Sequence, residues 1–366
     1  MTKYNEDNER IKHKYFAFLK DAKRLSEQSV DGVASALYRF ETYTKHRDFK
    51  AFHYEQARAF KKHLAGQKAQ RTGKNLSKAT LHATLMQLKQ FFQWLSREPG
   101  YKSRIQYSDA EYFNLSLNDT HIATANREKK WPTMEQIKCA LDAMPANTDI
   151  ELRNRALFAF TILTGARDNA IASLKLKHID IEQGCVNQDA REVKTKFRKT
   201  IYTDFFPVGD EIRQIVVEWV NYLKAEKLWG NDDPLFPKTQ VTVGTNQQFE
   251  VDGLKREHWS NANSIRCIFK AAFNNAGMQH FNPHSFRHTL AHLCYKACKT
   301  PEQLKAWSQN LGHENVLTTL TSYGEIGRQQ QADIMRGLAN PQEVGQTSQK
   351  ELAQALAIIQ GAIITT

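Results

Sequence analysis

The chain has few cysteines and no long apolar segment, and both absences narrow the classes of protein to which it can belong. Five scattered cysteines occur among 366 residues, an odd number that is typical of reduced thiols rather than of a disulfide framework. No apolar run approaches the ~20 residues that a membrane helix needs. The N-terminal segment MTKYNEDNERIKHKYF lacks the apolar core of a signal peptide. We therefore expect a cytoplasmic protein without a membrane span.

The short Cys-x2-Cys loops of structural zinc sites are also missing. Cys294 and Cys298 lie four positions apart on a predicted helix, next to His288 and His292. Thiolates and imidazoles are ligands that zinc prefers, so a zinc site is one interpretation of this cluster. We favour packing in the core and predict no metal site.

Acidic residues are outnumbered by basic ones. The chain carries 51 Lys and Arg against 39 Asp and Glu, a net charge of +12, and its pI is about 9.3. Such an excess favours binding to a polyanion, because cations that neutralise phosphates release counterions. Charge can also serve solubility alone, so it does not by itself establish nucleic-acid binding.

The distribution of apolar residues predicts two domains. Residues 1–120 show helical spacing, most clearly from Leu81 to Leu95, with Ser77 as a capping residue before this helix. Periodicity fades over 121–132, which we interpret as an interdomain linker. It returns in 133–340, the predicted catalytic domain, and 341–366 form a weakly amphipathic tail.

The second domain is predicted to be mainly helical with a small β-sheet. Thr133 and Gln136 form a capping-box pattern, and Pro301 occupies a first helical position. A polar loop is expected after Pro234–Pro237. Four short β-like segments are expected at 179–181, 185–187, 192–195 and 200–203.

Several polar motifs could carry chemistry, although each has an ordinary interpretation. TGAR, which ends at Arg167, can be a helix terminus with a surface arginine. HSFR, from His284 to Arg287, can be a core histidine beside a surface arginine. LGH, which ends at His313, can be a helix C-cap followed by an exposed histidine. Their order on a strongly basic chain makes a joint role more plausible than chance.

Cleaving a phosphodiester without a metal requires three kinds of group. A nucleophile attacks phosphorus, cations or donors stabilise the added negative charge, and an acid protonates the leaving oxygen. Arginine suits the second task because its planar guanidinium binds two phosphoryl oxygens and stays charged.

The motifs resemble the active site of the tyrosine recombinases, the phage-integrase-like family. The family pattern is Thr-Gly-x-Arg at a helix end, a lysine on a β-hairpin, His-x-x-Arg, Leu-Gly-His and a tyrosine soon after. The match is dense in the second half, whereas residues 1–120 match only in pattern, as the helical, SAM-like core-binding domain of such proteins. The corresponding residues of this chain are Arg167, Lys194, His284, Arg287, His313 and Tyr323.

The resemblance implies a role for each residue. Tyr323 attacks a DNA phosphate and forms a 3′-phosphotyrosine. Arg167 and Arg287 hold the non-bridging oxygens. His313 donates to one of these oxygens, and His284 acts as a base or a second donor.

The resemblance implies that Lys194 protonates the leaving 5′-oxygen. It implies no metal and no cofactor, since the covalent link preserves the energy of the phosphodiester. The expected partner is double-stranded DNA with paired sites, bound by a homotetramer, and accessory DNA-bending or directionality factors can take part. The stretch Leu352–Ile359 is a candidate helix for exchange between protomers; folding on its own protomer is the alternative.

Basic loops are further candidates for DNA contact. They are Lys68, Arg71, Lys74 and Lys78 in the first domain, and Lys196 and Arg198 in the second.

The sequence departs from the family pattern in two places. Tyr323 follows His313 by 10 positions, one more than usual, and Ala170 stands where an acidic residue is usual, so that Asp168 is the nearest acid. Two alternative functions stay open: a type IB topoisomerase-like enzyme, which uses similar residues, and a DNA-binding relative without catalysis, which the extra residue before Tyr323 favours. The DNA site, and the choice among integration, excision and resolution, are not readable from the sequence.

Overall fold

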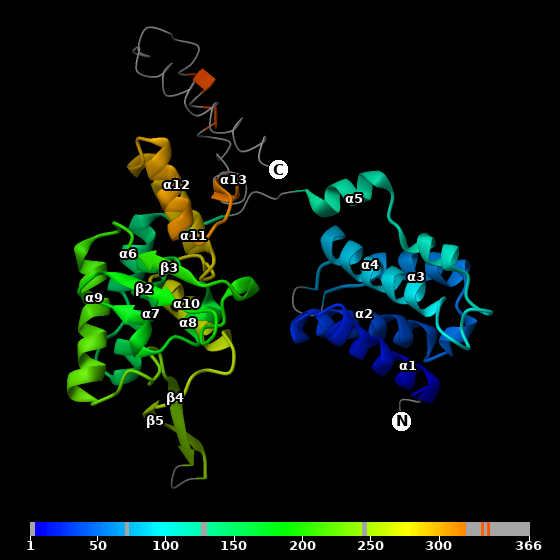
Figure 1. The fold of residues 1–366 in the computed structure, drawn as a ribbon, viewed down its shortest axis with the longest axis horizontal. Coiled ribbons are helices and arrows are strands. Elements are labelled where there is room, and N and C mark those ends of the chain that lie inside the picture. The colour runs from blue at the N-terminus through cyan, green and yellow to red at the C-terminus, as the bar shows by residue number, and fades with distance from the viewer. Residues whose placement is uncertain are drawn as a thin grey trace. The chain divides into compact units, whose positions relative to one another are not determined.

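The computed structural model describes residues 4–69, 73–125, 130–243, 247–319, 331–332 and 335–336. The chain divides into two compact units between Arg127 and Glu128, and each unit has its own apolar core (Figure 1). This division falls inside the range 121–132 that the sequence suggests as a linker.

The N-terminal unit is helical. Ser77 begins the clearest helix as predicted, because its hydroxyl accepts a hydrogen bond from the backbone N–H of Thr80. The last helix reaches Thr124, beyond the predicted boundary at 120, and it buries none of its residues, which explains why apolar periodicity did not reveal it. The helices are α1 (Glu6–Ala17), α2 (Glu27–Thr44), α3 (Tyr54–Gly66), α4 (Lys78–Leu95) and α5 (Leu117–Thr124), with shorter helical turns at Phe18–Ala22, Phe49–Ala51 and Tyr107–Phe113.

The C-terminal unit is mainly helical with small sheets, which confirms the predicted fold class. Capping boxes at Thr133–Gln136 and Thr300–Gln303 begin two of its helices as predicted. The helices are α6 (Met134–Asp142), α7 (Asp149–Thr164), α8 (Asp168–Ile171), α9 (Asp210–Asn221), α10 (Asn263–Asn275), α11 (Ser285–Ala297), α12 (Pro301–Asn310) and α13 (Val316–Thr318), with turns at Leu176–His178, Lys196–Arg198 and Tyr222–Glu226.

Three short antiparallel strands form one sheet in the order β1 (Ile179–Asp180), β2 (Cys185–Gln188) and β3 (Ile201–Asp204). Three of the four predicted strands are therefore confirmed, and the prediction of a strand at 192–195 was wrong. The carbonyl of Asp189 accepts hydrogen bonds from the N–H groups of Glu192 and Val193. These bonds close a turn, so this part of the backbone does not pair with a strand.

A second antiparallel hairpin, β4 (Lys238–Val243) and β5 (Phe249–Lys255), occupies the predicted polar loop after Pro237, so that prediction was wrong. In Figure 1 it extends from the end of the unit opposite α12. Val241 and Val251 pair across the hairpin, yet both are more than half exposed. A strand without a buried face has no apolar alternation to recognise.

Helix α7 lies in the centre of the C-terminal core. Every residue from Ala156 to Thr164 is buried. The helix ends at Gly165, whose φ of +60° is left-handed. A Cβ atom at this position would lie 3.0 Å from side-chain atoms of both Leu290 and Leu311, so glycine also permits the close approach of α11 and α12. This helix end places the TGAR motif.

Candidate active site

Arg167 stands directly after the end of α7, at the residue that precedes α8. Its side chain is half-buried. Within the described ranges its guanidinium makes no ion pair with a carboxylate. The nearest acid in sequence, Asp168, pairs instead with Arg266, with 3.0 Å between Nε and Oδ2. Asp168 therefore does not take the place of the acidic residue that the chain lacks at Ala170.

Arg287 comes from the first turn of α11 and is only 3% exposed. Its Nη1 donates to the carbonyl of Gly165 at 2.6 Å, and its Nη2 donates to the carbonyl of Leu311 at 2.5 Å. These two carbonyls belong to the TGAR and LGH motifs. The buried cation therefore joins three segments that lie far apart in the sequence.

His313 receives a further hydrogen bond from the same guanidinium. Arg287 Nη2 lies 2.8 Å from His313 Nε2, and because a guanidinium only donates, Nε2 accepts. Nδ1 lies 2.8 Å from Thr319 Oγ1, which itself donates to Ser308 Oγ at 2.8 Å. This chain of contacts assigns the proton of the neutral ring to Nδ1.

Burial, together with nearby positive charge, keeps His313 neutral. Desolvation is the largest cause, and the charges of Arg287, Arg167 and His284 add to it, which lowers the pKa of His313 to about 3. The same effect shows that these four side chains gather in one place. Four of the six residues predicted to be catalytic therefore form one cluster.

His284 and His288 lie on the same side of α11, with their ring centroids 5.9 Å apart. His284 is exposed, at the start of the helix. His288 is buried and lies near the ring of Trp131, at 5.8 Å between centroids. His284 is therefore the histidine of this pair that is accessible to a ligand.

Lys194 lies in the connection between β2 and β3 and is exposed. Its backbone N–H donates to Ser173 Oγ at 2.9 Å. Ser173 lies just after α8, the short helix that follows Arg167. Its hydroxyl donates to the carbonyl of Ala170 in this helix at 3.0 Å. Lys194 is thus attached to the arginine segment through its backbone, while its ammonium group remains at the surface.

The β2–β3 hairpin also contacts the LGH turn. Thr203 Oγ1 donates to the carbonyl of Asn310 at 3.1 Å, and a Cβ at Gly312 would lie 2.9 Å from the side chain of Ile201. Gly312 has a φ of +71°. The hairpin that carries Lys194 therefore lies against the segment that carries His313.

Ser173, Ser308 and Thr319 were not identified from the sequence. No local motif marks them. Ser173 contacts Lys194, 21 positions further along the chain, and Ser308 and Thr319 contact each other and His313 only through the fold of the segment around the LGH turn. The basic residues of the N-terminal unit have mixed environments. Lys68 and Lys74 are exposed, whereas Lys78 pairs with Asp119 at 2.8 Å.

Some predicted sites lie outside the described residues. They are Tyr323, Arg71 and the tail 341–366.

In the described part of the chain, no group of three or more His, Cys, Asp or Glu is arranged to hold a metal ion. Cys294 is buried, with its Sγ 3.3 Å from that of Cys298.

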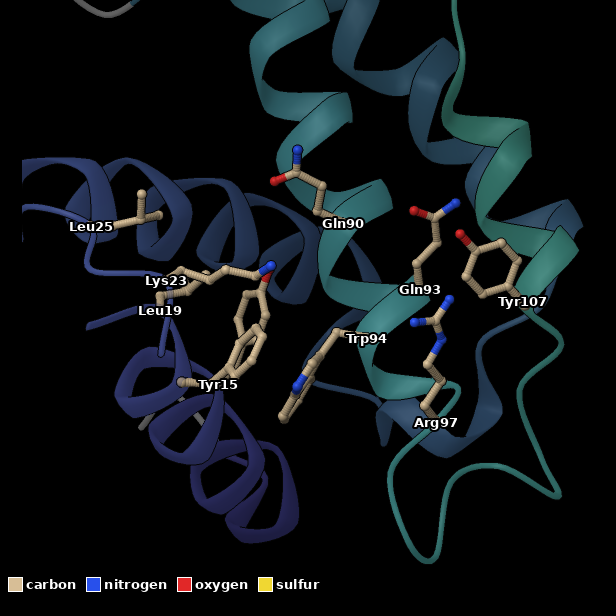
Figure 2. Close-up of a pocket in the computed structure, with 10 residues that line it drawn as sticks. Tyr15, Leu19, Lys23, Leu25, Gln90, Gln93, Trp94, Arg97 and Tyr107 are labelled. Carbon is tan, nitrogen blue, oxygen red and sulfur yellow. The ribbon is translucent and has the colours of Figure 1, made fainter. Parts of the chain in front are cut away.

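A surface hollow of about 520 Å³ lies in the N-terminal unit, between the end of α1 and the second half of α4 (Figure 2). Aromatic rings of Tyr15, Trp94 and Tyr107 line it, together with Lys23 and Arg97. It contains no histidine and no carboxylate. Its lining has one arginine, Arg97, so it offers no counterpart to the two arginines and two histidines around Arg287.

Two arginines and two histidines in a mainly helical unit, on a basic chain, form a cationic cluster of a kind that suits phosphate binding. The model of the phage integrase family matches residues 130–329, more than half of the chain, so the chain belongs to this family, the tyrosine recombinases. Among the described residues, no helix is long and apolar enough to cross a membrane.

Named relatives and solved structures agree with this assignment. Tyrosine recombinase XerD of Vibrio vulnificus is 25% identical over 241 residues, which cover 64% of this chain and 66% of the relative, just under two thirds of its length. Tyrosine recombinase XerC of Natranaerobius thermophilus is 23% identical over 315 residues, 83% of this chain and 90% of the relative. A lambda integrase (75–356) dimer bound to a COC′ core site has a similar fold, with a TM-score of 0.59 at 13% identity, covering 87% of this chain and 96% of that one.

Proposed function

We propose that this protein carries out site-specific DNA recombination through a covalent 3′-phosphotyrosine intermediate. The observation that supports it most is the joining of Gly165, Leu311 and His313 by the buried guanidinium of Arg287. Arg167 adds a second cation beside this group. The arrangement provides fixed positive charge where a phosphodiester gains negative charge in its transition state.

In the proposed first step, Tyr323 attacks phosphorus and the bond to the 5′-oxygen breaks. An unperturbed tyrosine has a pKa near ~10, so it needs the cationic pocket and a base to lose its proton. His284 is the candidate base because it is exposed beside the arginines. Lys194 transfers a proton to the leaving 5′-oxygen.

The second step reverses the first on a different strand. A 5′-hydroxyl attacks the phosphotyrosine, and Tyr323 leaves. Both steps conserve the number of phosphodiester bonds. Arg167 and Arg287 hold the non-bridging oxygens throughout.

His313 changes its role when a phosphate enters. In this structure its Nε2 accepts from Arg287 and carries no proton. A phosphate placed next to the arginines adds negative charge, which raises the pKa of the imidazole. The protonated ring then donates to a non-bridging oxygen, while Thr319 and Ser308 keep its orientation.

The N-terminal unit is proposed to bind duplex DNA as a core-binding domain, with Lys68 and Lys74 in contact with phosphates. Recombination joins two duplexes at paired sites, so the proposed assembly on DNA is a homotetramer with one protomer for each cleaved strand. Integration or excision of a phage or another mobile element is the proposed biological outcome.

The experiment is a trap for the covalent intermediate. Sites are first selected from a random duplex pool, and nicked versions of these sites are then incubated with the protein and run on a denaturing gel. Wild type is expected to form protein-linked DNA, Tyr323→Phe none, and Tyr295→Phe as much as wild type. Tight binding without an adduct would contradict the proposal in favour of a non-catalytic DNA-binding role.

A second assay separates recombination from nicking and closing. A plasmid with two selected sites is incubated with the protein. Products with exchanged flanking segments support recombination. Relaxation of supercoils without exchange would instead indicate a topoisomerase-like activity.

A further inference from the structure

The connection between β2 and β3 carries an exposed aromatic side chain, Phe197, at a position where the backbone has a left-handed conformation. Phe197 is 76% exposed, and its φ of 60° and ψ of 20° are left-handed. Arg198, the next residue, has a φ of 53°. Two successive non-glycine residues rarely adopt this conformation, because the Cβ atom clashes with the backbone. The backbone therefore presents Phe197 to solvent at a cost in conformational energy.

Cations surround this ring. Lys196 Nζ lies 4.8 Å from the ring centroid and Lys199 Nζ lies 5.9 Å from it. Lys199 also pairs with Glu314. Within the described ranges, Lys196 and Arg198 pair with no carboxylate. The tip of the hairpin thus combines one large apolar side chain with an excess of positive charge.

The hairpin is fixed at the candidate active site. One side of it is held by the hydrogen bond from the N–H of Lys194 to Ser173, which follows Arg167. The other side packs Ile201 against Gly312, next to His313. Phe197 therefore lies on an element that is attached to both sides of the phosphate-handling cluster.

We propose that Phe197 is a wedge that inserts into the DNA next to the scissile phosphate and unstacks a base step there. This inference rests on the function proposed above. Apolar side chains flanked by Lys or Arg unstack and kink duplexes in this manner, since the ring stacks on a base while the cations contact phosphates. Unstacking moves neighbouring base pairs away from each other beside the scissile phosphate. The cleaved strand then has to leave this duplex for its new partner.

The other hairpin of the C-terminal unit offers a matched comparison. Phe249 on β5 is 81% exposed, but Glu250 and Asp252 follow it on the same strand. Carboxylates at this position repel phosphates, so Phe249 is not suited to enter DNA. Both rings are exposed, but only Phe197 has neighbouring cations that favour contact with DNA.

The test uses 2-aminopurine, whose fluorescence rises when its base unstacks. Selected duplex sites carry this base at the position next to the scissile phosphate. Wild type is expected to raise the fluorescence on binding. Phe197→Ala is expected to lose most of the rise and to bind about tenfold more weakly, a typical loss for one base–aromatic stack. Phe197→Tyr, which keeps the ring, is expected to restore both.

Control variants make the outcome decisive. Phe249→Ala is expected to match wild type, and Phe197 is exposed, so its replacement leaves the core intact. A normal fluorescence rise with Phe197→Ala would overturn the wedge, and so would the absence of a rise with a wild type that forms the covalent adduct. A wild type that binds no DNA at all would overturn the proposed function and the wedge together.

Discussion

The two units differ in the kind of side chain that they bury. Both cores contain aromatic rings, and in the N-terminal core Phe52 is stacked on Phe92 at 3.7 Å and Phe40 is edge-on to Phe92 at 5.2 Å between centroids. Its described buried polar residues are few: Asn8, Glu41, Thr84 and Ser96. The C-terminal unit buries Arg287, His313 and many hydroxyl groups as well.

The difference separates two uses of buried side chains: apolar ones that only stabilise the fold, and polar ones that also form the candidate active site. Burial of apolar rings stabilises a fold without any requirement for partners. Burial of polar and charged groups is costly unless every group finds a hydrogen bond. In the C-terminal unit, Arg287 donates to carbonyls at helix ends, and His313 is hydrogen-bonded in series with Thr319 and Ser308.

The largest expected effect comes from removal of the buried cation. Arg287→Met should slow formation of the covalent adduct by about a hundred- to a thousandfold, because one donor to the transition state is lost. Arg153→Met is the matched control, since Arg153 is also 3% exposed in this unit but donates to the carbonyl of Pro237. Single-turnover cleavage by the folded fraction measures both. Equal loss in the two variants would mean that Arg287 acts only in folding.

Removal of a buried ring from the N-terminal core tests whether that core serves stability. Phe92→Ala should lower the free energy of unfolding of the N-terminal unit by about 3 to 5 kcal/mol. Phe92 is fully buried among other rings, and the cavity left by its side chain cannot be filled by them. Hydrogen–deuterium exchange of peptides from α4, followed across a denaturant series, reports on this unit. A shift of less than about 1 kcal/mol would contradict a tightly packed core.

The pH dependence of stability should reveal the neutral histidine. The pKa of His313 is about 3 in the folded chain, and an ordinary histidine has a pKa of 6.5, so below pH 6.5 the unfolded chain binds a proton that the folded chain does not. Stability from this group is complete above pH 6.5 and decreases as the pH falls. Between pH 7 and 5 the loss should be about 2 kcal/mol at most.

His313→Gln provides the reference for this measurement, because glutamine keeps a side-chain acceptor but does not titrate. Denaturation curves at several pH values give the two slopes, and the contributions of all other groups cancel in their difference. The wild type should be the more pH-sensitive protein. Parallel curves would show that His313 is not held neutral.

The smallest expected effect concerns the contact that positions Lys194. Ser173→Ala removes the hydroxyl that accepts from the N–H of Lys194, and it should slow cleavage by about three- to tenfold, the equivalent of one hydrogen bond. A substrate whose leaving 5′-oxygen is replaced by sulfur needs no general acid. This substrate should therefore react equally with both proteins; a deficit that persists would argue against an effect through Lys194.

Local patterns in the sequence were sufficient for several features. Ser77, Thr133 and Thr300 begin helices through contacts within one turn, so a short stretch of sequence contains all the partners. The motifs TGAR, HSFR and LGH likewise identified Arg167, His284, Arg287 and His313, which the structure brings together.

Other features depend on partners that are distant in the chain. The pairing of Asp168 with Arg266, the contact between Ser173 and Lys194, and the turn that replaced the strand predicted at 192–195 follow from the packing of separate elements. The β4–β5 hairpin has no buried face and therefore left no periodic pattern.

The sequence by itself determined the family, the helical class and the identity of the cationic and histidine residues, because these depend on composition and on short motifs. Only the tertiary structure decided that Arg287 donates to the carbonyls of Gly165 and Leu311, and that His313 is neutral with its proton on Nδ1. The physical reason is that hydrogen-bond direction and pKa depend on the groups that surround an atom in space.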